Sequence, residues 1–103
     1  MLKWIDDLYT GPGIEDAMEV IQAVNNGEQE EERYLITLPT NPANLMDFFK
    51  ADALKNPHVY ELCPAIIGVA VSKEEAMELS KQILMECYEK TGGFHIKDFI
   101  ENR

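Results

Sequence analysis

The chain contains one unbroken apolar run, from Ala65 to Val71. Pro64 precedes the run and a helix-capping residue follows it, so the run is short and sharply bounded. A run of this kind is typical of a β-strand that is buried on both faces of a sheet. Gly68 in its middle indicates that another element packs closely against the strand. We therefore expect residues 65–71 to form the central strand of the fold.

A long amphipathic helix is predicted directly after this strand. Ser72 is a suitable N-cap, and Glu75 occupies the capping-box position, from which its side chain would reach back to the Ser72 N–H. Gly92-Gly93 supplies a residue that can adopt the left-handed conformation and end the helix. The side chains expected to face the sheet are Ala76, Leu79, Ile83 and Cys87, flanked by Met77, Leu84 and Tyr88.

The N-terminal part of the chain predicts a strand, a loop and a helix. Apolar and polar positions alternate from Leu2 to Tyr9, as in a strand. Residues 10–13 contain Gly-Pro-Gly and are expected to form a loop. Apolar residues from Ile14 to Val24 follow helical spacing, and Asn25-Asn26-Gly27 would end that helix.

The middle of the chain predicts a second strand and a short helix. The strand covers Arg33 to Leu38 and stops at Pro39, because proline cannot donate to a β-ladder. Asn41-Pro42 is a favourable helix start, and the helix would continue to about residues 50–54. Its apolar side would consist of Leu45, Met46, Phe48 and Phe49. Residues 55–64, with two prolines, are expected to form an irregular crossover to the central strand.

The C-terminal tail fits two structures. Phe94 and Ile96 alternate as in a strand, whereas Ile96, Phe99 and Ile100 fit one side of a helical turn. In either case the large apolar side chains would dock on the same chain or on a partner chain, because together they would otherwise form an exposed apolar patch.

Alternation of strands and helices predicts an α/β protein. We expect one domain over residues 1–103, a small layered βαβαβα sandwich with a mostly parallel sheet of three to four strands. The alternative is an α+β fold in which the first strand or the tail pairs antiparallel at an edge of the sheet.

Composition and charge exclude several classes of partner. A hydrophobic fraction of 46% indicates a folded core rather than a disordered chain. The formal net charge of −10 disfavours nucleic acid and anionic membranes, since the phosphate groups would be repelled. The acidic run from Glu28 to Glu32 is expected to remain solvated.

The two cysteines, Cys63 and Cys87, do not form a metal-binding pattern. Two isolated cysteines are typical of a reduced, cytoplasmic protein. The N-terminal residues do not resemble a signal peptide, and no apolar run approaches the roughly 18 residues needed to span a membrane. No motif in the chain calls for a cofactor.

The candidate ligand site lies in the loops that would follow parallel strands. In open α/β sheets, ligands bind beyond the carboxyl ends of the strands, where helix N-termini present free N–H groups. This places a small anionic or polar ligand near Lys73, the one cationic residue of the set. The candidate residues are Thr10, Gly11, Gly13, Thr40, Asn41, Asn44, Ser72 and Lys73.

These features favour a non-enzymatic binding or regulatory module, because no catalytic constellation is recognisable in the sequence. The alternative is a small enzyme or enzyme subunit that uses the same loops together with Asp6, Asp7 or a cysteine. In that case Asp6 or Asp7 should lie near Lys73 in a cleft. A homodimer, with a site between the chains, is a further arrangement compatible with the sequence.

Overall fold

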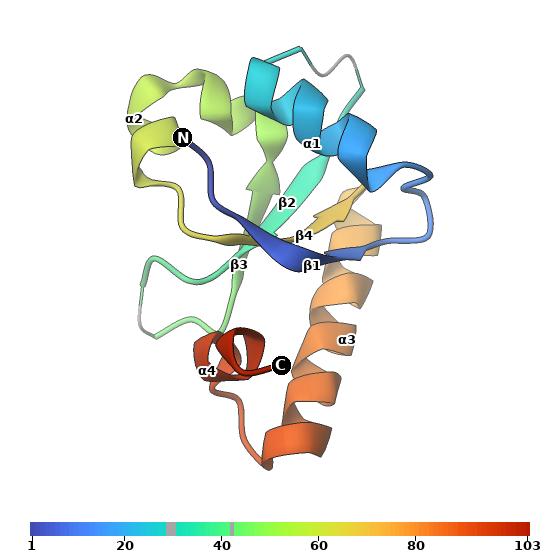
Figure 1. Ribbon diagram of the computed structural model, residues 1–103, viewed down its shortest axis with the longest axis vertical. Helices are drawn as coiled ribbons and strands as arrows, with labels where there is room; N and C mark the ends of the chain where they lie inside the picture. Colours follow the sequence, from blue (N-terminus) through green and yellow to red (C-terminus); the bar gives the residue numbers. More distant parts are fainter. Residues whose placement is uncertain (29–30, 42) are drawn as a thin grey trace.

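A four-stranded mixed sheet forms the middle layer of the protein, in the order β1-β4-β2-β3 (Figure 1). The computed structural model describes residues 1–28, 31–41 and 43–103. β1 (Trp4–Thr10) runs parallel to β4 (Ile66–Ala70), whereas β2 (Tyr34–Thr37) is antiparallel to both β4 and β3 (Asp47–Lys50). The predicted α/β class is confirmed. The sheet is mixed rather than mostly parallel, so the alternative with antiparallel edge pairing also fits.

The central strand lies where the apolar run predicted it. β4 has a neighbour on each side, and all five of its residues are buried. A Cβ atom added to Gly68 would lie 3.3 Å from Ile36 Cδ1 and 3.4 Å from Leu79 Cδ2. The expected close packing at this glycine is therefore confirmed.

Helices cover both faces of the sheet, which explains why β4 has no polar residue. α1 (Ala17–Asn26), the 3₁₀ helix η1 (Ala51–Lys55) and α2 (Pro57–Leu62) lie on one face. α3 (Lys73–Thr91) and α4 (Ile96–Glu101) lie on the other face (Figure 1). Each layer of helices encloses its own apolar core, and β4 contributes to both: Ile66 and Val69 pack in one core and Ile67 packs in the other.

The long helix α3 is capped at both ends as the sequence indicates. Ser72 Oγ accepts a hydrogen bond from the Glu75 N–H at 3.1 Å, and Gly92 adopts the left-handed conformation at φ 75°. Glu75 does not complete the predicted capping box, however. Its Oε1 accepts from the Val71 N–H, 3.1 Å away, rather than from Ser72. The predicted stripe is buried, and it consists of Ala76, Leu79, Ile83 and Cys87.

Helix α1 begins later than the apolar spacing predicts, at Ala17 rather than Ile14. The reason is Asp16, whose carboxylate accepts from the Glu19 N–H and so acts as the N-cap. Gly27, at φ 67°, ends the helix as expected.

The prediction of a helix over residues 41–54 is wrong. Residues 47–50 form strand β3, and the 3₁₀ helix η1 follows it. β3 pairs with β2, and Phe48 and Phe49 lie opposite Ile36 and Leu35. Consecutive strand residues point to opposite faces, so the two rings contribute to both sides of the sheet instead of one side of a helix. Pro42, the predicted first helical residue, lies outside the described residues.

The predicted irregular crossover over residues 55–64 contains the short helix α2. Asn56 Oδ1 accepts from the His58 N–H at 2.9 Å, and Pro57 occupies the first turn, so the local sequence supplies both an N-cap and a favourable start. The helix ends at Leu62, before the Cys63-Pro64 pair.

The C-terminal tail forms helix α4, which decides between its two predicted structures. Ile96 and Phe99 are 3% and 4% exposed and pack in the core beneath α3. At the end of the tail, the Arg103 guanidinium lies 4.7 Å from the centre of the Tyr9 ring and donates to the Asp7 carbonyl. The tail therefore docks on its own chain.

Candidate functional site

The candidate loops do not gather at one edge of the sheet, where edge means the side at which the strands end and not an edge strand. β1 and β4 are parallel, so Thr10, Gly11 and Gly13 lie at the same edge as Ser72 and Lys73. β2 runs the opposite way, and its following loop therefore lies at the other edge. The predicted set is divided in two, and the second group contains Thr40, Asn41 and Asn44.

At the first edge, a carboxylate of the chain itself occupies the N–H group of one candidate residue, Gly13, and that of the neighbouring Val71. Glu75 Oε2 accepts from the Gly13 N–H and Oε1 from the Val71 N–H, each at 3.1 Å. A Cβ atom on Gly11 would lie 2.0 Å from Glu75 Oε1, so only glycine leaves room for this carboxylate. Glu75 thus joins the start of α3 to the loop after β1.

This internal carboxylate opposes an added anion at the first edge. An anion at Ser72-Lys73 would have to displace Glu75 or lie beside it, at the cost of like-charge repulsion. Lys73 and Thr10 are exposed there. Binding of a small anion at this edge stays a prediction.

At the second edge, Asp47 closes the loop between β2 and β3. Its Oδ2 accepts from the Thr40 N–H at 3.0 Å and from Thr40 Oγ1 at 3.2 Å, and its Oδ1 accepts from Asn44 Nδ2 at 3.2 Å. Asn41 Oδ1 accepts from the Ala43 N–H at 2.9 Å, which forms a side-chain-stabilised turn rather than a helix cap.

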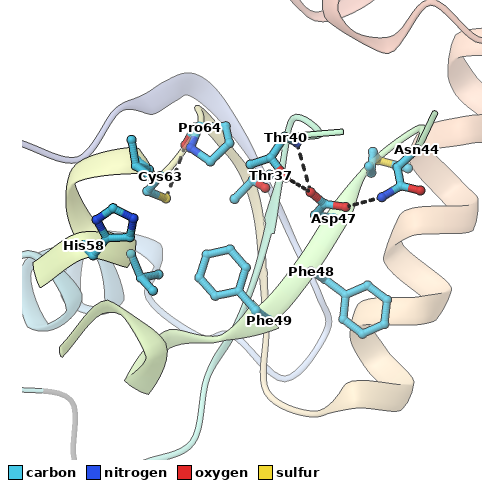
Figure 2. Close-up of a pocket in the computed structure, with 12 residues that line it drawn as sticks. Thr37, Thr40, Asn44, Asp47, Phe48, Phe49, His58, Cys63 and Pro64 are labelled. Atoms are coloured by element: carbon cyan, nitrogen blue, oxygen red, sulfur yellow. Dashed lines mark hydrogen bonds between the residues drawn. The ribbon is translucent and has the colours of Figure 1, made fainter. Parts of the chain in front are cut away.

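A pocket of about 630 Å³ opens beside this loop, between β3 and α2. Figure 2 shows Asp47 with Thr40 and Asn44 on one side of the Phe49 ring, and His58 of α2 and Cys63, the residue after α2, on the other side. The residues that line the pocket are Thr37, Thr40, Asn44, Met46, Asp47, Phe48, Phe49, His58, Val59, Leu62, Cys63 and Pro64. Of these residues, only Thr40 and Asn44 belong to the ligand-binding set predicted from the sequence.

The register of the sheet explains how the pocket forms. Thr37 pairs with Asp47, and Phe49 lies two residues further along β3, so all three point to the face that α2 covers. α2 supplies the opposite wall with Val59 and Leu62. Leu62 is 62% exposed although it is apolar, so the pocket rim keeps apolar surface in contact with water.

Cys63 is the most reactive residue type in the pocket, but its environment favours the thiol over the thiolate. Its Sγ donates to the Pro64 carbonyl at 3.4 Å, and burial raises the pKa of the thiol above its ordinary value. His58 lines the same pocket from one turn earlier in the chain and is exposed.

The acidic pair Asp6 and Asp7 does not form a cleft with Lys73. The two residues are consecutive within β1 rather than at its end, so they point to opposite sides of the strand, and both are exposed. None of the ion pairs found within residues 1–28, 31–41 and 43–103 includes Asp6, Asp7 or Lys73. The feature that would favour an enzyme at this edge is therefore missing from the described part of the chain.

Comparison with known proteins found no matching family model, no matching curated protein and no matching solved structure. Within the part of the chain that the structure describes, no group of three or more His, Cys, Asp or Glu side chains could hold a metal ion. The same residues contain no helix with the length and apolar character needed to cross a membrane. The pocket between β3 and α2, where apolar side chains and several polar groups line one cavity, is the candidate functional site.

Proposed function

We propose that the protein is a non-enzymatic binding or regulatory module whose ligand occupies the pocket between β3 and α2. The observation that supports this proposal is the composition of the pocket. Its volume of about 630 Å³ lies within the roughly 300–1,000 Å³ of typical small-molecule sites. Apolar side chains form most of the lining, and a few polar groups converge at one end, as such sites require.

The pocket also lies where a ligand could influence several elements at once. Its lining residues come from the end of β2, from β3, from α2 and from the segment that leads into β4. A ligand that bridges β3 and α2 would stabilise the contact between an edge strand and a short helix. Such a ligand would raise the melting temperature, because it would bind the folded chain and not the unfolded one.

The test is a thermal-shift screen of small molecules, followed by NMR mapping of each compound that raises the melting temperature. Compounds that bind in the pocket should shift the amide signals of Phe49, Val59 and Cys63. Leu62→Trp should block the pocket mouth and abolish these shifts. Met77→Trp is the matched control, since Met77 is also an exposed apolar helix residue but lies on α3. Binding that survives Leu62→Trp and maps to other residues would contradict the proposal.

The second candidate function, a small enzyme, is favoured by one observation: Asp47, His58 and Cys63 line the same pocket. A cysteine nucleophile requires a lowered pKa or an adjacent base. Burial acts in the opposite direction on the pKa of Cys63, and the thiol donates to the Pro64 carbonyl instead of to His58. We therefore rank the binding module first.

We propose a cytoplasmic location for this module, supported by the fact that Cys63 and Cys87 are both free thiols. The homodimer remains a proposal as well. Light scattering on the purified chain would measure its mass in solution directly.

A further inference from the structure

One charged side chain lines the pocket between β3 and α2. Among the twelve lining residues that the structure describes, Asp47 is the one Asp, Glu, Lys or Arg. None of the ion pairs found in the described part of the chain includes Asp47. Three donors, the N–H and Oγ1 of Thr40 and Nδ2 of Asn44, fix its position.

We infer that the pocket selects an organic cation, a small molecule with an apolar body and an ammonium group directed at Asp47. This inference rests on the proposed binding function and names the class of ligand. The apolar body would contact Phe49, Val59 and Leu62, and the ammonium group would lie beside the Asp47 carboxylate. Figure 2 shows the two parts of the site next to each other, with Asp47 on one side of the Phe49 ring.

The Asp47 carboxylate retains the capacity to accept an ammonium group. Two carboxylate oxygens offer about four lone-pair sites. Oδ2 accepts two hydrogen bonds and Oδ1 accepts one, so at least one site remains. The existing donors also hold the carboxylate in place before binding, so little side-chain freedom would be lost when a ligand arrives.

The charge of Asp47 favours a cation over an anionic or a neutral ligand in this pocket. An anion would meet the Asp47 carboxylate within a chain of net charge −10, and no Lys or Arg of the described lining could pair with it. A neutral apolar molecule could use the walls of the pocket but would leave the carboxylate without a new partner. The same net charge raises the local concentration of cations around the protein.

Three probes with one apolar body and different head groups test the inference: phenethylammonium, 2-phenylethanol and 3-phenylpropionate. Each is titrated into the isotopically labelled full chain at pH 7 and followed by NMR. Phenethylammonium should bind about two- to fivefold more tightly than 2-phenylethanol, the range expected for one partly exposed ion pair. 3-Phenylpropionate should bind most weakly. The Asp47 side-chain carboxyl ¹³C signal should shift with the ammonium probe and remain unchanged with the alcohol.

Two variants separate the Asp47 carboxylate from the general charge of the protein. Asp47→Asn keeps a side-chain oxygen as acceptor for Thr40 but removes the charge, so the preference for the ammonium probe over the alcohol should disappear. Glu89→Gln changes the net charge by the same amount at an exposed position of α3 and should keep the preference. If Asp47→Asn does not fold, the Asp47 carboxyl signal in the unchanged chain still decides the question.

The outcomes distinguish this inference from the proposed function. If all three probes shift Phe49 and Val59 with equal affinity, the pocket binds ligands but the cation preference is wrong. If the ammonium preference persists in Asp47→Asn, it comes from the overall field and the role of Asp47 is wrong. If no probe shifts the pocket residues at millimolar concentration, the inference is wrong, whereas the proposed function would still be decided by the thermal-shift screen.

Discussion

At the scale of single residues, the Cys63 thiol distinguishes a binding pocket from a catalytic one. Burial raises the pKa of Cys63, so the thiol should stay protonated at neutral pH. We expect alkylation of Cys63 by iodoacetamide to be slow at pH 7 and to accelerate with rising pH, with half of its plateau rate reached at a higher pH than for an ordinary exposed cysteine, because burial raises the pKa of the thiol. Mass spectrometry of peptides would separate Cys63 from the buried Cys87.

His58→Ala is the control for this measurement. If His58 does not activate the thiol, the variant should show the same alkylation profile as the unchanged chain. Fast alkylation at pH 7 that His58→Ala suppresses would instead support the enzyme and overturn the ranking of the two functions.

Close packing around Gly68 explains why this position has no side chain. A Cβ atom there meets Ile36 and Leu79 at 3.3 Å and 3.4 Å, so one methyl group is tight and two more have no room. We expect Gly68→Val to lower the free energy of unfolding by roughly 1–3 kcal/mol and Gly68→Ala to lower it less. Valine favours strands more than glycine does, so a loss must come from packing. Urea unfolding measures both variants, and equal stability of Gly68→Val would show that the core there is open.

At the scale of elements, the contact between the start of α3 and the loop after β1 depends on Glu75 and Gly11 together. Glu75→Ala would leave the N–H groups of Val71 and Gly13 without their acceptor and should cost about 1–3 kcal/mol. Gly11→Ala should cost a similar amount, because its Cβ would push the carboxylate away. Since both variants break the same contact, their combination should cost clearly less than the two costs added.

Glu74→Ala is the matched control for this cycle. Glu74 also lies in the first turn of α3 and is exposed, and within the described residues it makes no hydrogen bond to the loop after β1, so its loss should act mainly through the helix dipole. Its effect should be about 0.3–1 kcal/mol, and additive costs for Gly11→Ala and Glu75→Ala would contradict the proposed contact.

The docking of α4 predicts a sharp contrast between two phenylalanines of the tail. Phe99 is 4% exposed in the core under α3, and Phe99→Ala should cost about 3–5 kcal/mol. Phe94 is 47% exposed and stacks on Tyr88, so Phe94→Ala should cost less than about 1.5 kcal/mol. Thermal unfolding compares the two variants, and similar melting temperatures would mean that α4 does not form part of the core in solution.

Helices and strands were predictable from the sequence where the spacing of apolar residues fitted only one element type, or where capping residues marked the ends of a helix. The apolar run of β4 and the capped stripe of α3 had no competing interpretation. Residues 45–49 were different, because Leu45, Met46, Phe48 and Phe49 fit one side of a helix as well as a short strand. Pairing with β2 decides for the strand, and that contact joins segments that local sequence cannot relate.

At the scale of the whole molecule, the position of the site was less predictable than the class of the fold. Alternating strands and helices indicated α/β layers, but the direction of β2 leaves no periodic trace in the sequence. That direction moved Thr40 and Asn44 away from Ser72 and Lys73. Phe49, His58 and Cys63 come from segments predicted as a helix side and an irregular crossover, and only the folded arrangement brings them to Asp47.

The order β1-β4-β2-β3 also has a consequence for how the chain acquires its structure. β4 lies between β1 and β2, although both precede it in the chain, so neither can pair with the other while β4 is absent. Until residues 66–70 have been synthesised, the sheet is limited to the β2–β3 hairpin, and an isolated hairpin is at best marginally stable. Completion of the sheet requires a long loop closure from β1 to β4, which tends to be slow. The four-stranded sheet should therefore form only after β4 has left the ribosome. α3 follows β4 directly in the chain and would then pack on the sheet.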